Sequence, residues 1–97
     1  MGAGMSAAAA AFEVALTATN TEYSFALPRG TKGFRIQCRD ATDVRLAFET
    51  GKVAGSTSPY HTVKSGHVMQ VDNLYSGRTL YLAATGGSKV VEILCFT

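Results

Sequence analysis

The amino-acid sequence predicts an all-β fold: a single antiparallel β-sandwich or jelly-roll-like barrel of seven or eight strands, with an extended N-terminal arm. Three observations support this prediction. From residue 12 onward apolar residues alternate with polar ones at a period of two. Turn-forming residues recur about every eight to twelve positions, and no helical period follows residue 11. With 97 residues in all, the sandwich would occupy residues 12–97, leaving no room for a second core.

The N-terminal arm, residues 1–11, reads MGAGMSAAAAA and contains no charge and no large side chain except two methionines. Its alanine run is too short to form a helix on its own in water. We expect a neighbouring subunit to hold the arm, with a disordered tail or docking onto its own domain as alternatives. The arm residues expected to bind a partner are Met1, Gly2, Ala3, Gly4, Met5 and Ser6.

The first half of the domain contains four runs in which every second residue is apolar: 12–16, 23–27, 34–38 and 44–48. Turn-forming sequences separate them, because Gly and Pro interrupt regular pairing and Asn and Asp favour turns. The last of these turns is only Asp40-Ala41-Thr42-Asp43, so we expect the two runs beside it to form a hairpin. At this spacing Asp40 and Asp43 are expected to cap backbone N–H groups.

The second half begins with a long surface connection at residues 51–59, which is rich in loop-forming residues. Strands are expected at 67–72, 79–84 and 89–96, and the Gly86-Gly87 pair predicts a hairpin between the last two. The final strand is apolar on both faces apart from Glu92, so we expect it to be central or covered on both sides. The expected core consists of Phe12, Val14, Leu16, Phe25, Phe34, Ile36, Leu46, Phe48, Val71, Leu80, Leu82, Val91 and Ile93.

Composition and motifs argue against several function classes. Nine Lys and Arg against seven Asp and Glu give a net charge of +2, without the dense basic patch of a dedicated nucleic-acid binder. No apolar run approaches a membrane span, and the start of the chain lacks a basic signal-peptide region. Cys38 and Cys95 belong to no CxxC pair, which favours a reducing compartment and two buried thiols. We therefore expect no nucleic-acid partner and no membrane partner.

The sequence offers no recognisable catalytic or metal-binding constellation. The two histidines and two cysteines lack the local spacing of zinc ligands. A triad of Ser65, His67 and Asp72 has no nucleophile-elbow motif, and Val53 follows Gly51-Lys52 where a phosphate loop needs Ser or Thr. We expect no enzyme activity, no cofactor and no metal.

Two surface features suggest binding. Arg35, Gln37 and Arg39 follow the outward face of one strand and Arg45 lies on the next, so pairing of these strands would join three guanidinium groups in one patch. Such a patch suits an acidic protein surface better than nucleic acid, because no aromatic residues are interleaved with it. The alternative is a solvated face balanced by nearby carboxylates.

The second feature is aromatic. Tyr60, Tyr75 and Tyr81 would together make a platform for stacking against sugars. The alternative is that Tyr81 is an ordinary strand residue and Tyr75 anchors a turn.

Five segments, in order, carry a resemblance to a known group: Phe34-Arg-Ile-Gln-Cys-Arg-Asp-Ala-Thr-Asp-Val-Arg-Leu-Ala-Phe48, Gly51-Lys-Val-Ala-Gly55, Tyr60-His-Thr-Val-Lys-Ser-Gly66, Thr79-Leu-Tyr-Leu-Ala83 and Val90-Val-Glu-Ile-Leu94. Over about residues 14–97 this order resembles small virion structural proteins of tailed bacteriophages. The motifs are structural patterns without catalytic residues. The group includes β-sandwich proteins that decorate or cement the capsid and others at vertices, head fibres or the head-to-tail junction.

The resemblance implies a non-enzymatic virion protein that binds and reinforces the capsid surface, assembled in the cytoplasm of a bacterial host. The expected partners are the major capsid protein or another virion protein and further copies of the chain, with a trimer favoured. The alternative is a head-fibre, head-to-tail or tail component, which would include a glycan- or receptor-binding module that uses Tyr60 and the preceding loop.

Overall fold

The computed structural model describes residues 9–74 and 78–97, which form eight strands and no helix. The strands are β1 (Ala9–Leu16), β2 (Tyr23–Ala26), β3 (Gly33–Cys38), β4 (Val44–Ala47), β5 (His61–Val63), β6 (Val68–Val71), β7 (Thr79–Ala84) and β8 (Lys89–Phe96). In this part of the chain no helix is long and apolar enough to cross a membrane.

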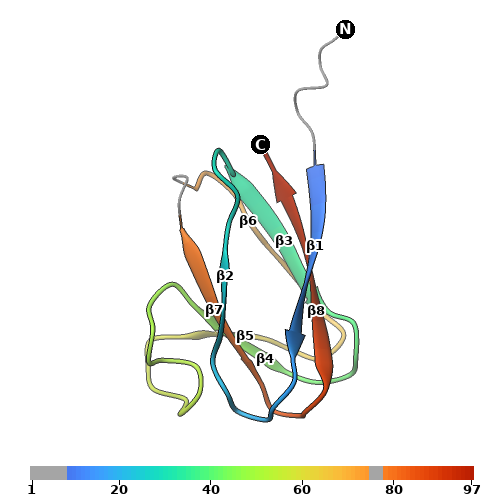
Figure 1. Ribbon diagram of the computed structural model, residues 1–97, viewed down its shortest axis with the longest axis vertical. Helices are drawn as coiled ribbons and strands as arrows, with labels where there is room; N and C mark the ends of the chain where they lie inside the picture. Colours follow the sequence, from blue (N-terminus) through green and yellow to red (C-terminus); the bar gives the residue numbers. More distant parts are fainter. Residues whose placement is uncertain (1–8, 75–77) are drawn as a thin grey trace, which may run out of the picture.

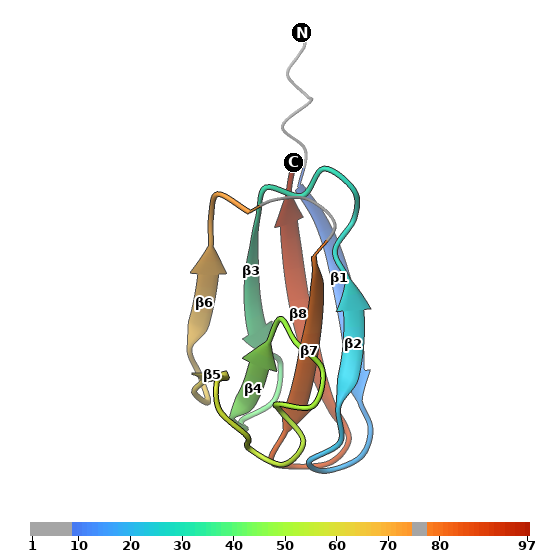
Figure 2. The same ribbon diagram turned by 90° about the vertical axis from the view of Figure 1, so that its left-hand side faces the viewer.

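The strands form two antiparallel sheets of four, with the orders β1-β8-β3-β6 and β2-β7-β4-β5 (Figures 1 and 2). The chain changes sheet after every strand except β4, and β1 pairs with β8, β2 with β7, β3 with β6 and β4 with β5. Four antiparallel pairs wrapped into two stacked sheets make a jelly roll. The predicted all-β sandwich is therefore confirmed, and its topology is the jelly-roll alternative.

The two predicted hairpins are wrong. β3 and β4 lie in different sheets, as do β7 and β8, so the turns between them cross from one layer to the other. The crossings lie side by side: the hydroxyl groups of Thr42 and Thr85 are 2.9 Å apart, and the amide of Val90 donates to Asp40 Oδ2 at 3.2 Å. A strand with one apolar face can bury that face whether it pairs with the next strand in a hairpin or lies in the opposite sheet and packs against it. Alternation alone therefore did not distinguish a hairpin from a crossing between sheets.

β8 is central, as predicted, because it pairs with β1 on one side and β3 on the other. β1 begins at Ala9, three residues before Phe12, where the sandwich domain was expected to begin. Its alanines continue the ladder, with Ala9 opposite Phe96 and Ala11 opposite Leu94. The part of the arm that precedes the first strand is thus residues 1–8, which lie outside the described residues.

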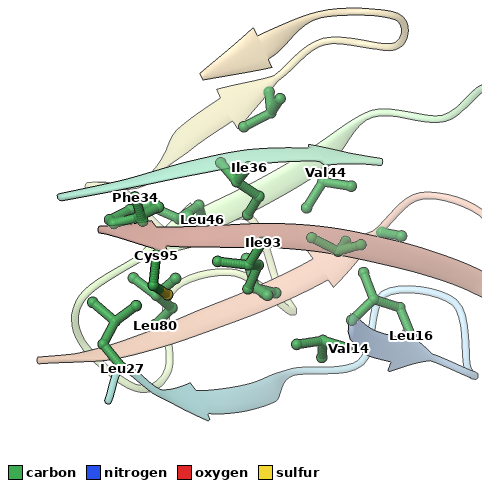
Figure 3. Close-up of a cluster of buried hydrophobic side chains, with 14 residues drawn as sticks. Val14, Leu16, Leu27, Phe34, Ile36, Val44, Leu46, Leu80, Ile93 and Cys95 are labelled. Atoms are coloured by element: carbon green, nitrogen blue, oxygen red, sulfur yellow. The ribbon is translucent and has the colours of Figure 1, made fainter. Parts of the chain in front are cut away.

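The core fills the space between the sheets (Figure 3). Every residue of the predicted core is either buried there or packed against it. Five further buried members are Leu27, Val44, Val63, Ala84 and Cys95. At the β1–β2 side of the sandwich the rings of Phe12 and Phe25 pack with their centroids 5.4 Å apart, which closes that side.

A second, smaller cluster lies on the outer face of the β2-β7-β4-β5 sheet. Val53, in the connection between β4 and β5, is fully buried against Ala47 and Ala83, with Tyr81 packed beside them. The predicted surface loop therefore folds back over the sheet and is anchored there by an apolar side chain.

Candidate functional site

The outer face of the β1-β8-β3-β6 sheet carries two of the predicted arginines, Arg35 and Arg39, and Arg39 is the centre of a polar network. Arg39 Nη2 donates to Glu13 Oε2 at 2.5 Å, and Arg39 Nε donates to Glu92 Oε2 at 2.9 Å. Gln37 Nε2 donates to the other oxygen of Glu92 at 2.9 Å. Glu13 of β1, Glu92 of β8 and Arg39, which directly follows β3, therefore form a network of two carboxylates around one guanidinium.

The electrostatics follow from these contacts. The hydrogen bonds from Gln37 and from Arg39 lower the pKa of Glu92 below its ordinary value. The hydrogen bonds to Glu13 and Glu92 raise the pKa of Arg39. Arg35, two residues before Gln37, donates to Gln70 Oε1 from Nη2 at 3.0 Å and from Nε at 3.3 Å. Arg35 is therefore the exposed guanidinium of this face that a partner carboxylate would meet first.

The prediction that Arg45 joins this patch is wrong. Arg45 lies on β4 in the other sheet and is 7% exposed. Its Nε donates to the carbonyl oxygen of Val53 at 2.5 Å, and its Nη2 donates to Asn20 Oδ1 at 2.6 Å and to the carbonyl oxygen of Ala54 at 3.4 Å. The alternating pattern correctly placed Arg45 on the outer face of its sheet. The connection between β4 and β5 folds back over Arg45, whose side chain donates to the backbone of that connection and holds it in place.

The carboxylates next to the turns act on the backbone, as predicted. Asp43 Oδ1 accepts from the amide of Ser65 at 2.8 Å, and this bond lowers the pKa of Asp43. Glu22 acts similarly, since it accepts from the hydroxyl of Thr50 at 2.7 Å and from the amide of Gly51 at 2.8 Å. These side chains fasten loops.

A cleft of about 580 Å³ opens between the two sheets at their β5 and β6 edges. We call it the β5–β6 cleft; its lining residues are Leu46, Ala47, Phe48, Glu49, Pro59, Tyr60, His61, Met69, Gln70, Val71 and Arg78. In Figure 2, β5 and β6 lie on the side of the molecule opposite β1 and β2. The cleft thus marks the open side of the sandwich, across from the side that Phe12 and Phe25 close.

The floor and the rim of this cleft differ in chemistry. Leu46 is buried at the floor, and Phe48, Met69 and Val71 are half-buried around it. On the rim, the guanidinium carbon of Arg78 lies 4.5 Å from the centre of the Phe48 ring. Tyr60 is 36% exposed, one of two large apolar side chains classed as exposed within residues 9–74 and 78–97.

The rim is also rich in unused polar groups. The side chains of Glu49, Tyr60 and His61 have no hydrogen bond or ion pair to any other residue in the described part of the chain. An apolar floor beside free polar groups is the usual composition of a binding cleft. This is the best candidate binding site in the structure.

Sequence reasoning found Tyr60 but missed Phe48, Met69 and Arg78 as its neighbours. These residues come from three separate segments that only the sandwich brings together. Tyr81 is on β7, opposite Ser24 and Ala47, as expected of a strand residue. Tyr75 and the predicted arm residues Met1 to Ser6 lie outside the described residues.

The other candidate chemistries are not assembled. Among residues 9–74 and 78–97, no three His, Cys, Asp or Glu side chains are grouped to hold a metal ion. His67 Nδ1 lies 3.2 Å from the carbonyl oxygen of Ser65, whereas Asp72 Oδ1 accepts from Gln70, so these three residues form no catalytic relay. Both cysteines are free, and burial raises the pKa of each thiol.

No protein-family model, curated protein or solved structure matches this chain. The class of protein is defined by its fold, an eight-stranded antiparallel jelly roll with one open side.

Proposed function

We propose that this protein is a non-enzymatic structural subunit that binds the surface of a larger protein assembly and reinforces it, with its N-terminal arm contacting neighbouring subunits. The assembly to which the sequence resemblance points is the capsid of a tailed bacteriophage, with the major capsid protein as partner. The jelly-roll fold by itself does not identify this role, because viral capsid proteins, lectins and cupins share the fold.

The observation that carries the proposal is the position of β1. Among residues 9–74 and 78–97 this strand is hydrogen-bonded only to β8, so it forms one edge of its sheet. Its first backbone pair is Ala9 opposite Phe96, so the chain is held in the sheet from Ala9 onward. A contact between residues 1–8 and a neighbouring subunit would be coupled to the folded domain through β1. On a symmetric surface many copies of such a weak contact act together, which gives avidity.

The organisation of the domain also suits a static role. The outer face of the β1-β8-β3-β6 sheet carries the ion pairs of Arg39 with Glu13 and Glu92, and the loop that Arg45 and Val53 hold covers part of the opposite outer face. Arg35 then provides an exposed cation on the first of these faces for an acidic partner surface.

The test is co-sedimentation of the purified chain with capsids stripped of accessory proteins, with the bound copies counted. We expect many copies per capsid and a higher temperature of capsid disruption. Deletion of residues 2–8 leaves β1 intact, because the first strand begins at Ala9. This variant should bind fewer copies and lose most of the heat protection. Binding confined to tails or vertices, or to glycans, would contradict the capsid role and favour a fibre or receptor-binding protein.

A further inference from the structure

We infer that the β5–β6 cleft receives the N-terminal segment, residues 1–8, of a second copy of this chain. The inference rests on the proposed function, in which the arm contacts a neighbouring subunit, and adds the place where it binds. It assigns a role to the apolar opening at the β5 and β6 edges of the sandwich.

The first argument is the apolar surface that the cleft leaves open. Phe48, Met69 and Val71 are half-buried, and Tyr60 stands at the mouth. On the opposite side of the sandwich the rings of Phe12 and Phe25 pack against each other. An occupant that covers the open side would remove this surface from water, which is the main driving force of association.

The second argument is the chemistry of the segment. Residues 1–8 read MGAGMSAA, with no charge and with Met1 and Met5 as the only large side chains. In an extended chain residues four apart lie on the same face, so both methionines would enter the cleft together. Methionine packs well against aromatic rings, and Phe48 and Tyr60 provide two. Gly2 and Gly4 permit a close backbone approach.

The third argument is the free backbone on both sides of the cleft. Within the described residues, 9–74 and 78–97, β5 pairs only with β4 and β6 pairs only with β3, so each presents an edge without a partner strand there. A strand added to such an edge gains backbone hydrogen bonds and places alternate side chains toward the interior. Met69 and Val71 of β6 already point that way.

Two other placements of the segment are less favourable: on the outer face of the β1-β8-β3-β6 sheet, and in the cleft of its own copy. A segment without charged side chains lying on the outer face of the β1-β8-β3-β6 sheet would desolvate the Arg39, Glu13 and Glu92 network, and none of its side chains could form an ion pair with that network. The segment of the same copy starts on β1, three strand spacings or about 14 Å from β6. Eight residues span at most about 29 Å, so half of that length would be used in crossing. Donation between copies leaves the whole segment available for binding. A head-to-tail arrangement of this kind forms a ring, such as the trimer that the sequence resemblance favours, when the rotation between neighbouring copies closes.

The test begins with self-association of the full chain, measured by sedimentation equilibrium. The cleft variants are Tyr60→Ser and Met69→Gln, and the arm variant is Met5→Ser. The matched control is Val68→Ser, because Val68 is on the same strand as Met69 but faces outward and is 52% exposed. We expect each of the three variants to weaken association by about tenfold or more, and the control to leave it unchanged.

A second measurement locates the contact and avoids the question of folding. A synthetic peptide of residues 1–8 is added to the isotopically labelled chain that lacks residues 2–8, and amide chemical shifts are followed by NMR. We expect shifts concentrated at residues 46–49, 60–63 and 68–71. Shifts elsewhere, no shifts, or a full chain that stays monomeric would overturn the inference, and so would a saccharide that occupies the cleft while deletion of the arm changes nothing.

Measurements of capsid binding distinguish the failure of this inference from the failure of the proposed function. If deletion of the arm lowers capsid binding while Tyr60→Ser and Met69→Gln do not, the inference fails and the proposed function stands. If the cleft variants abolish self-association but the chain never binds capsids, the inference stands and the capsid role fails.

Discussion

Arg45 and Val53 hold each other on the outer face of a sheet: the arginine donates to the valine carbonyl at 2.5 Å, and the valine side chain is fully buried beside Ala47. The pair fixes the connection between β4 and β5, which carries Tyr60 and one wall of the β5–β6 cleft. The shape of the candidate site therefore depends on contacts made on the other side of the β2-β7-β4-β5 sheet.

Arg45→Leu is expected to destabilise the protein by about 2–3 kcal/mol, because it leaves the carbonyl oxygens of Val53 and Ala54 without their buried donor. Urea unfolding measures the change. Arg35→Leu is the matched control, since Arg35 is exposed and hydrogen-bonds only to Gln70, and it should change stability by about 0.5 kcal/mol or less. Equal losses in the two variants would contradict the clamping role of Arg45.

Val53→Ala removes the apolar anchor of the same loop. The expected cost is about 2 kcal/mol, from lost burial and the small cavity left beside Ala83. We also expect faster proteolysis within residues 50–58, because the loop then leaves the sheet more often. Limited proteolysis at native temperature measures this rate. A loop cleaved at an unchanged rate would mean that Val53 does not hold it.

Acid sensitivity is expected from Glu92. Its pKa lies below the ordinary value of 4.5, first because Gln37 and then because Arg39 donates to it. The folded state thus favours the carboxylate, so this stabilisation is complete above pH 4.5 and is lost as the pH falls through the lower folded-state pKa. An NMR titration should show the pKa of Glu92 rising toward its ordinary value in Gln37→Ala. Arg35→Ala, on the same strand but without contact to Glu92, should leave that titration unchanged.

The two thiols are expected to react slowly in the folded protein. Burial raises the pKa of Cys95, which is 1% exposed, and of Cys38, whose Sγ donates to the carbonyl oxygen of Val90 at 3.6 Å. The half-buried Cys38 should react first with a thiol reagent near neutral pH, and Cys95 only on unfolding. Both should react quickly in denaturant. Rapid labelling of Cys95 in the native protein would contradict the buried position.

The register of the β3–β8 pair predicts that an oxidant will not join Cys38 and Cys95 of one chain in a disulfide. Cys38 lies opposite Val91 and Cys95 lies opposite Phe34, so the two cysteines are four positions, or about 13 Å, apart along the β3–β8 pair. A disulfide needs Cα atoms within about 7 Å. Mass spectrometry after mild oxidation checks this.

Much of the fold was predictable because its signals are local. The positions of most strands, the central place of β8 and the whole predicted core follow from alternating residues and from one run that is apolar on both faces. The start of β1 was missed, because alanines fit a small-residue arm as well as they fit a strand edge beside Phe96.

The candidate site was less predictable. Tyr60 was identified, but its neighbours Phe48, Met69 and Arg78 lie far from one another in sequence and meet only across the open side of the sandwich. Arg45 was misassigned because its chemistry is that of a surface arginine. Only the loop that returns over β4 turns it into a buried donor.

By itself, the sequence determined the all-β class and which apolar residues of the expected strands join the core, since a period of two is a property of one extended chain. The tertiary structure decided which strands pair, which turns cross between sheets, which arginine is covered and which edge stays open. Those outcomes depend on the packing of distant segments against one another, and each strand's own pattern is compatible with several such packings.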